Sequence, residues 1–143
     1  MNARTFVDTN VLIYAHDVDA RGKHEIAKSI LKELWNRRTG ALSTQVLQEF
    51  YVNVTRKIAT PLPKPSARAI VDNYFAWSID TTPAEISAAF LIEDQACISF
   101  WDALIIAAAR KAGADRILSE DLNSGQTMFG VRIENPFSGP GSQ

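Results

Sequence analysis

Four carboxylates come from four separate segments of the chain, and three of them lie near predicted strand ends or helix starts. They are Asp8, Glu49, Asp102 and Asp121. Asp8 directly follows the apolar pair Phe6 and Val7. Thr9 or Asn10 is the expected N-cap of the helix that follows. A carboxylate withdrawn from water costs free energy unless something pairs with it, so Asp8 needs partners.

The chemistry of such a cluster points to a divalent cation. Carboxylates brought together repel one another and raise one another's pKa. A cluster of this kind is tolerable only if it shares protons or holds cations. The two histidines, His16 and His24, do not have the spacing of a metal site. Hard oxygen ligands without a cysteine or histidine cluster are typical of Mg²⁺ or Mn²⁺, which we expect as the cofactor.

The elements that would position these residues alternate along the chain. Apolar segments predict strands at 4–8, 41–43, 77–81, 116–119 and 131–133. Helical periodicity and caps predict helices at 11–16, 24–38, from 43 or 44 to about 58, 67–75, from 83 through 92, and 99–112. The proline-rich residues 60–65 form a connector between two of them. Alternating strands and helices favour an α/β protein with a mostly parallel sheet covered by helices on both faces.

This alternation gives each carboxylate a place. Asp8 and Asp121 would lie at the C-terminal tips of the first and fourth strands, the edge where ligands bind in open α/β sheets. Asp102 would lie in the first turn of the helix that begins after Ser99. Glu49 would lie half-buried in the helix after the second strand. Three of the four side chains would therefore emerge on one edge of the sheet.

Each of these residues also has a structural alternative. Asp102 fits a capping pattern with Ser99, and Asp8 could cap its own helix. Glu49 could form an ion pair with a basic residue further along its helix, either Arg56 or Lys57. Asp121 and Asn123 are common in turns, and spacing alone cannot separate Asp121 from its neighbour Glu120.

Composition bounds the class of protein. The 143 residues suggest one domain, which we place at 1–137, with a disordered tail at 138–143. The formal net charge of −1 gives no overall basic field, so a nucleic acid would need a local basic patch. Cys97 is alone and excludes an internal disulfide. No signal peptide is visible, and the apolar run 103–109 is too short to span a bilayer, so we expect a cytoplasmic protein without a membrane segment.

The remaining conspicuous side chains have ordinary interpretations. The two histidines are predicted to be solvated. The three tryptophans lie in apolar patterns and are predicted to be core residues rather than platforms for nucleobases; they are Trp35, Trp77 and Trp101.

Four short motifs in order resemble those of PIN domains, in particular the toxin ribonucleases of the VapC type. They are Phe-Val-Asp-Thr-Asn-Val-Leu at 6–12, Gln-Glu-Phe-Tyr at 48–51, Phe-Trp-Asp-Ala-Leu-Ile at 100–105 and Ser-Glu-Asp-Leu-Asn at 119–123. The order and spacing match from residue 5 to about residue 134. The opening motif alone is a weak signal, whereas the four together are specific.

The resemblance implies a fold, an activity and partners. The fold would be a three-layer α/β/α sandwich with a mostly parallel central sheet. The activity would be Mg²⁺- or Mn²⁺-dependent cleavage of RNA by the four carboxylates, with Thr9, Asn10 and Ser119 in support. Many relatives carry a further Asp at the position of Asn123, so a fifth metal-binding charge is in doubt. Such toxins usually dimerise and are inhibited by an antitoxin that covers the groove, so we expect a homodimer and a cognate antitoxin.

The chemistry of phosphodiesters suggests roles for these residues. Asp8 and Asp102 would be metal ligands, Asp121 would complete the site, and Glu49 would hold the attacking water. Hydrolysis of this type leaves 5′-phosphate and 3′-hydroxyl ends. The RNA would be held by local basic residues, for which the candidates are Lys23, Arg56, Lys57 and Arg68.

Two other functions fit parts of the sequence. A PIN-like adaptor could bind RNA or protein without cleaving it, although degenerate members usually lose one or more of the acids. A phosphotransferase that uses the strand-end Asp8 as its nucleophile is the second alternative. That chemistry needs a second aspartate two residues later, where this chain has Asn10.

Overall fold

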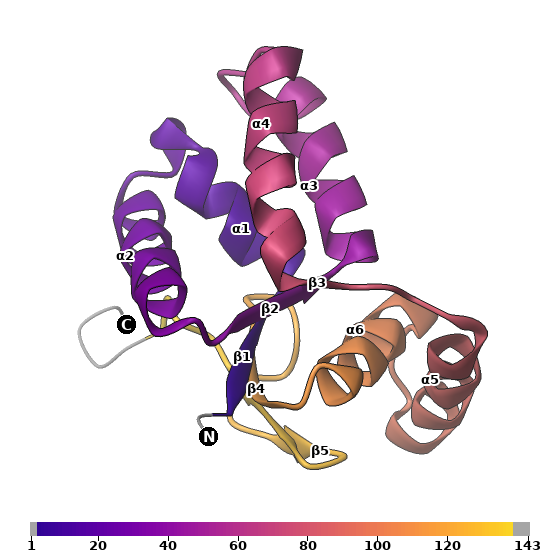
Figure 1. The fold of residues 1–143 in the computed structure, drawn as a ribbon. Helices are drawn as coiled ribbons and strands as arrows, with labels where there is room; N and C mark the ends of the chain where they lie inside the picture. The colour runs from indigo at the N-terminus through magenta and orange to yellow at the C-terminus, as the bar shows by residue number, and fades with distance from the viewer. Residues whose placement is uncertain (1–2, 139–143) are drawn as a thin grey trace.

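A six-stranded sheet forms the centre of the computed structural model, which describes residues 3–138 (Figure 1). Its strand order is β3-β2-β1-β4-β6-β5. The strands are β1 (Arg4–Val7), β2 (Gly40–Ser43), β3 (Ser78–Ile79), β4 (Ala114–Leu118), β5 (Thr127–Met128) and β6 (Val131–Glu134). Every pairing is parallel except that of β5 with β6. The sheet is therefore mostly parallel, as predicted.

Six α-helices cover the two faces of this sheet. They are α1 (Thr9–His16), α2 (Gly22–Arg37), α3 (Thr44–Arg56), α4 (Lys64–Tyr74), α5 (Pro83–Ala96) and α6 (Phe100–Lys111). Figure 1 shows α1 to α4 on one side of the sheet and α5 with α6 on the other. Two short 3₁₀ turns, at Val18–Ala20 and Phe75–Trp77, also lie within residues 3–138. This arrangement confirms the three-layer α/β/α sandwich.

The core explains why these segments became the central elements. Phe6 and Val7 of β1 are fully buried, because β1 has strands on both sides and helices on both faces. Helix α6 is buried from Ala103 to Ala109 without interruption, since it is enclosed between the sheet and α5. Small alanines at most of these positions allow the close packing that this middle position requires. The sequence's longest apolar run is thus an internal helix.

Several predicted boundaries were wrong. Helix α1 begins at Thr9 with Asp8 as its N-cap, so neither Thr9 nor Asn10 has that role. Helix α2 begins earlier than predicted and α3 ends earlier, whereas α4 starts inside the proline-rich connector. The third strand is only two residues long, because Trp77 belongs to a 3₁₀ turn. The short strand β5 was not predicted.

Some predictions of burial were also wrong. Trp77 is buried, but Trp35 is 45% exposed and Trp101 is 64% exposed. His16 is not a solvated residue, since its ring packs against Phe50 and Tyr74 at centroid distances of 5.5 and 6.0 Å. Burial lowers the pKa of His16 to about 4, so this side chain is neutral at pH 7.

Two further predictions concern the C-terminal tail and the absence of a membrane segment. Residues 139–143 of the predicted tail lie outside the described residues. Among residues 3–138, none of the helices combines the length and the apolar character that a bilayer crossing requires.

Gly40 offers a test of the packing between β2 and the turn that precedes β3. A Cβ atom at this position would lie 2.6 Å from Cε2 of Trp77, a ring fixed in the core. We therefore predict that Gly40→Ala lowers the free energy of unfolding by about 1–3 kcal/mol, the usual cost of overpacking. Gly22→Ala is the matched control, because a Cβ there meets nothing within 4 Å. Urea denaturation measures both, and an equal stability of the two variants would contradict this account of the packing.

Candidate functional site

Asp8 lies at the tip of β1, where the chain turns into α1. The register of β1 with β4 pairs Val7 with Leu118, which brings the next residues, Asp8 and Ser119, opposite each other. The Asp8 amide donates to the Leu118 carbonyl at 3.0 Å and continues this ladder. The carboxylate is only 8% exposed. Its predicted place at the sheet edge is thus confirmed, and the alternative role as a helix cap is also real.

The two oxygens of Asp8 have different partners. Oδ1 accepts a hydrogen bond from the Thr9 amide at 2.7 Å, which caps α1. Oδ2 accepts one from the Ser119 hydroxyl at 2.7 Å. Both bonds leave lone pairs free on the carboxylate oxygens, so the group keeps its capacity to bind a cation.

Ser119 organises the loop after β4. Its hydroxyl oxygen accepts hydrogen bonds from the amides of Asp121 at 3.1 Å and Leu122 at 3.3 Å while it donates to Asp8. Asn10 holds the same loop from α1, since its side-chain oxygen accepts from the Glu120 amide at 3.1 Å. Its amide donates to Oδ2 of Asp121 at 2.9 Å. Asp121 is thereby fixed beside the start of α1.

The structure separates Glu120 from Asp121, which sequence spacing could not do. Glu120 accepts a hydrogen bond from the Tyr14 hydroxyl at 2.6 Å and forms an ion pair with Lys23. The Lys23 ammonium lies 5.0 Å from the centroid of the Tyr14 ring and 5.8 Å from that of Phe137. These contacts lower the pKa of Glu120 despite its partial burial. Glu120 is therefore compensated, and Asp121 remains the carboxylate available to the site.

Glu49 and Asp102 come from two further elements. Glu49 is exposed on α3, not half-buried as predicted, because that helix turns this side chain outward. The Gln45 amide donates to its carboxylate at 3.1 Å. No ion pair with Arg56 or Lys57 occurs among the described residues. Asp102 lies in the first turn of α6, where its backbone amide donates to the Ser99 hydroxyl at 3.1 Å.

Electrostatics connect three of the four predicted carboxylates. Burial is the main cause that raises the pKa of Asp8 to about 6, and the charges of Asp121 and Glu49 raise it further. The hydrogen bonds from Ser119 and Thr9 oppose this rise. Asp102 is not among the groups that affect Asp8. Within residues 3–138, no three acidic, histidine or cysteine side chains lie close enough together to hold a metal ion as a ready-made group.

Two buried oxygens near these acids have no hydrogen-bond partner among the described residues. They are Oγ1 of Thr9 and Oε1 of Gln45. Thr9 follows Asp8, and Gln45 is the residue that donates to Glu49. Buried polar atoms are rarely left without partners, so these oxygens add to the oxygen donors already present around Asp8 and Glu49. The donor set of carboxylates, hydroxyls and amide oxygens fits Mg²⁺ or Mn²⁺.

The sequence missed the supporting roles of several residues. Gln45 could have been found, because it lies four residues before Glu49 on the same helix face. Tyr14 and Lys23 gave no such signal, since their contact with Glu120 joins segments about a hundred residues apart. Asn123, which was predicted as a possible support, is exposed and has no hydrogen bond among the described residues.

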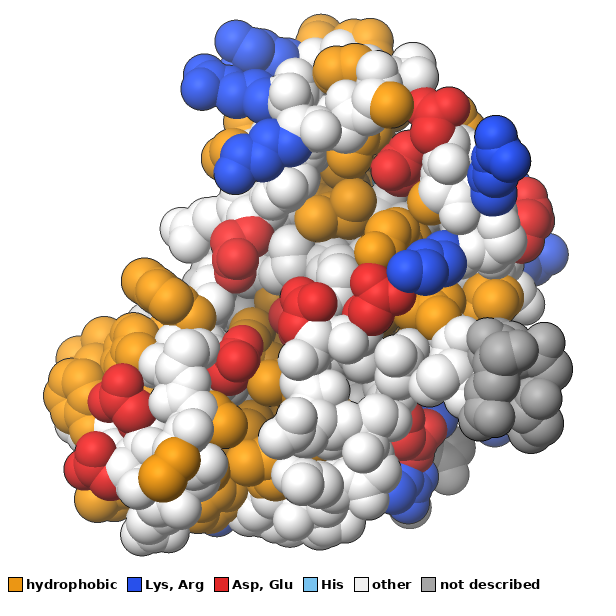
Figure 2. Space-filling model, turned by 180° about the vertical axis from the view of Figure 1, so that it is seen from behind, with side chains coloured by type: hydrophobic (Ala, Val, Ile, Leu, Met, Phe, Trp, Pro, Cys, Tyr) orange, Lys and Arg blue, Asp and Glu red, His pale blue; other side chains and the backbone are white. Residues whose placement is uncertain are grey.

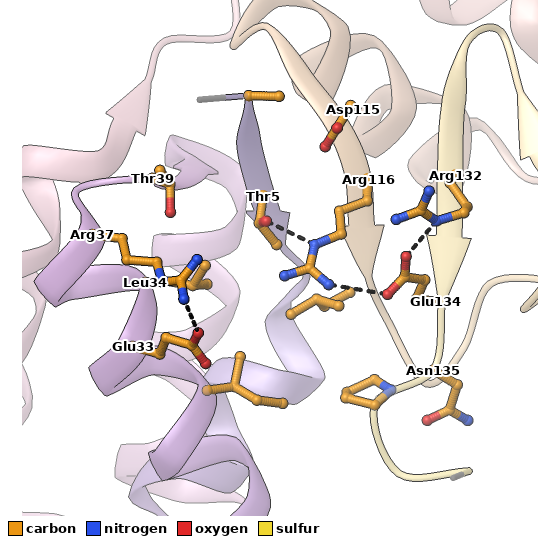
Figure 3. Close-up of a pocket in the computed structure, with 14 residues that line it drawn as sticks. Thr5, Glu33, Leu34, Arg37, Thr39, Asp115, Arg116, Arg132, Glu134 and Asn135 are labelled. Carbon is orange, nitrogen blue, oxygen red and sulfur yellow. Dashed lines mark hydrogen bonds and ion pairs between the residues drawn. The ribbon is translucent and has the colours of Figure 1, made fainter. Parts of the chain in front are cut away.

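Acidic side chains gather on one face of the molecule. Figure 2 shows several acidic side chains around a depression in the middle of this face, with basic side chains gathered at its upper corner. A separate groove of about 620 Å³ lies over β1, β4 and β6 beside α2 (Figure 3). Its arginines are paired with acids, since Arg116 and Arg132 both contact Glu134, and Arg37 contacts Glu33. None of the four predicted carboxylates lines that groove.

A mostly parallel sheet, with Asp8 and Asp121 beyond the C-terminal ends of its central strands, agrees with the comparison of this chain with protein families. Residues 5–126 match the family model described as the PIN domain. The chain therefore belongs to the PIN domain family. In a sequence comparison, no curated protein matched it.

Solved structures similar to this chain include toxins and toxin–antitoxin complexes. VapC20 of Mycobacterium tuberculosis, a sarcin–ricin loop cleaving toxin, is 22% identical, with a TM-score of 0.60 over 82% of this chain and 89% of that one. A toxin–antitoxin complex of Klebsiella pneumoniae is 16% identical, with a TM-score of 0.67 over 93% and 98%. VapBC2 of Rickettsia felis, bound to a promoter DNA fragment, is 20% identical, with a TM-score of 0.64 over 92% and 97%. At these identities the likeness shows the shared fold.

The buried carboxylate predicts a specific dependence of stability on pH. The pKa of Asp8 is about 6 in the folded protein against 3.8 ordinarily, so the native state holds this proton more tightly. The contribution of Asp8 to the free energy of unfolding therefore falls as the pH rises from about 4 to about 6, and it stays low above pH 6. We predict that Asp8→Asn has a more stabilising effect on the metal-free protein at pH 7.5 than at pH 4, and that the two effects differ by about 1–2 kcal/mol.

Urea denaturation in EDTA at the two pH values measures this difference. The exposed Asp94 on α5 supplies the control, since Asp94→Asn should change stability little at either pH. If Asp8→Asn and wild type lost stability in parallel over this range, the buried carboxylate would not be the source of the pH dependence.

Proposed function

We propose that this protein is a Mg²⁺- or Mn²⁺-dependent endoribonuclease and the toxin of a toxin–antitoxin pair. The observation that carries the proposal is the buried Asp8 at the tip of the central strand, bonded to Ser119 and electrostatically coupled to Asp121 and Glu49. A structural cap would not need two further carboxylates close to it. Membership of the PIN domain family supports the same activity.

Each carboxylate has a distinct proposed role. Asp8, Asp102 and Asp121 would hold the cation, and exposed Glu49 would accept a hydrogen bond from the attacking water. When bound, Mg²⁺ or Mn²⁺ supplies an acidified water and offsets negative charge on the phosphate. Ser119 orients Asp8 and, by favouring its charged form, keeps a ligand oxygen available. Asn10 orients Asp121 by a hydrogen bond of its own. The products would carry 5′-phosphate and 3′-hydroxyl ends.

The structure argues against the phosphotransferase alternative. The position that would need the general acid is Asn10, whose side chain already bonds both the Glu120 amide and Asp121. The non-catalytic adaptor predicts the same fold and is separated by the activity test below.

Partners form the second part of the proposal. The similar structures from Klebsiella pneumoniae and Rickettsia felis contain an antitoxin with their toxin, and we propose a cognate antitoxin for this chain.

We also propose a homodimer, because α5 and α6 expose a cluster of large apolar side chains. They are Phe90, Leu91 and Trp101, which are between 52% and 64% exposed. Exposed apolar patches of this kind mark interaction sites. A role on cellular RNA would place the protein in the cytoplasm.

Cleavage of RNA is the decisive test of the activity. The purified protein should cleave total RNA in Mn²⁺ and leave 5′-phosphate ends. We predict that Asp8→Asn and Asp102→Asn each lower the cleavage rate by at least about 100-fold while remaining folded. Asp94→Asn is the control and should cleave like wild type. A folded Asp8→Asn variant with the wild-type rate would refute the assignment, and a wild-type protein that binds RNA without cutting would favour the adaptor.

Cation binding should also be visible without any reaction. Ions that bind only the native state stabilise it, by about 2.7 kcal/mol at a hundredfold excess over the dissociation constant. We therefore predict that Mg²⁺ or Mn²⁺ raises the melting temperature by a few degrees and that Asp102→Asn reduces this shift. Differential scanning fluorimetry with and without the ion measures it. An undiminished shift in Asp102→Asn would show that the ion binds elsewhere.

A further inference from the structure

A groove between α3 and α4 lies on the flank of the acidic site. Its volume is about 360 Å³, within the range of sites that take small ligands. The residues that line it are Thr44, Leu47, Gln48, Tyr51, Arg68, Val71, Asp72 and Phe75. None of these residues takes part in the cluster of carboxylates.

The position of this groove follows from the sheet. Thr44, which lines its floor, is the first residue after β2. β2 pairs with β1, the strand that ends at Asp8, and neighbouring strands lie about 4.8 Å apart. Gln48 precedes Glu49 on α3, so the two side chains point about 100° apart around the helix. One flank of α3 therefore carries Glu49 towards the acids, and the next flank forms the groove.

The walls of the groove combine aromatic faces with polar groups. The guanidinium of Arg68 lies 5.9 Å from the centroid of the Tyr51 ring, and its Nε donates to the Tyr51 hydroxyl at 3.2 Å. Phe75 is 55% exposed. Leu47 and Val71 add aliphatic side chains to the lining, and Gln48 adds an amide that can both donate and accept. Aromatic faces with a few edge-reading polar groups are what unpaired nucleobases bind.

The groove includes one exposed acid, Asp72, but the exposed basic residues around it are more numerous, so the balance of charge favours a polyanion. Exposed basic residues come from the end of α3 and the start of α4, at the end of the groove away from the acids. They are Arg56, Lys57, Lys64 and Arg68. The basic side chains at the upper corner in Figure 2 gather at this end of the molecule. An RNA strand passing from the acids along α3 would thus have cationic groups beside its phosphates. An apolar peptide side chain would make no use of these charges.

We propose that the groove between α3 and α4 binds one unpaired nucleobase next to the scissile phosphate and so sets the base preference of cleavage. This inference rests on the proposed ribonuclease activity for its consequence. The binding itself requires only the groove and the basic residues. Phe75 and Tyr51 would stack on the base, and Gln48 would read its hydrogen-bonding edge.

Two variants with matched controls test the groove. Phe75→Ala removes the exposed ring, whereas Phe75→Tyr keeps it. Gln48→Ala removes the edge-reading amide, and Gln95→Ala, at an exposed position on α5, is its control. Binding of short single-stranded RNAs of each base is measured by fluorescence anisotropy in EDTA. Cleavage of a random single-stranded library in Mn²⁺ is measured in parallel, and the new ends are sequenced.

We expect Phe75→Ala to weaken RNA binding about tenfold and to raise KM rather than lower kcat, while Phe75→Tyr retains wild-type values. Gln48→Ala should flatten the base preference at one position beside the cut, and Gln95→Ala should not. Wild-type affinity and an unchanged preference in both Phe75→Ala and Gln48→Ala would overturn the proposal. The same holds if these variants lose only inhibition by an antitoxin, because the groove would then bind protein. A different outcome is that wild type binds RNA with a base preference that the variants lose, but does not cleave it. This result would support base binding in the groove and refute the proposed ribonuclease activity.

Discussion

The hydrogen bond between Asp8 and Ser119 is the interaction on which the rest of the site depends. It joins the ends of the two central strands, β1 and β4, at the edge where the helices begin. The same carboxylate caps α1, and the same hydroxyl accepts the amides that shape the loop carrying Asp121. Both groups are buried, so each would be costly without the other. One bond thereby fixes the sheet edge, the first helix and the fourth acid.

The acidic side chains near this bond differ in what stabilises their negative charge. Glu120 is compensated within the protein, by Lys23 and the Tyr14 hydroxyl, and the ring of Phe137 packs on Tyr14 at 5.2 Å to complete this arrangement. Asp8 is compensated only by neutral donors, and its pKa rises. Adjacent acids, Glu120 and Asp121, thus serve opposite purposes. The first holds the loop on α1 and α2, and the second leaves its charge directed at the site. The uncompensated charge is what the proposed cation would offset.

The fold and the position of Asp8 could be predicted because they depend on local patterns. An apolar strand that stops at a carboxylate and is followed by a helix can be recognised within one short segment. Exposure could not be predicted in the same way. Glu49 and Trp101 lie in apolar surroundings in the sequence, but which side of a helix is covered depends on neighbours that are distant in the chain. The sequence shows that a helix has an apolar face without showing what packs against it.

The missed strand β5 has a different cause. It is two residues long and turns back on β6 through Phe129 and Gly130, both with positive φ. Such a turn usually shows itself as Asn-Gly or Asp-Gly, and a phenylalanine in this conformation gives no signal. The pairing of Glu120 with Lys23 and Tyr14 was missed for the reason that it is entirely non-local. Prediction from sequence therefore succeeded where one segment determines the outcome and failed where two must meet.

The strand order also bears on how the protein is made. Translation delivers Asp8 early, whereas Ser119 follows 111 residues later, and the strands on which they lie are direct neighbours. Until β4 has left the ribosome and paired with β1, the carboxylate has no hydroxyl partner and Asp121 is not beside it. Domains are synthesised from the N-terminus, so this site is assembled among the last parts of the fold. Products of interrupted synthesis that stop before β4 thus lack Ser119 and Asp121, so the proposed site requires chains translated beyond that strand.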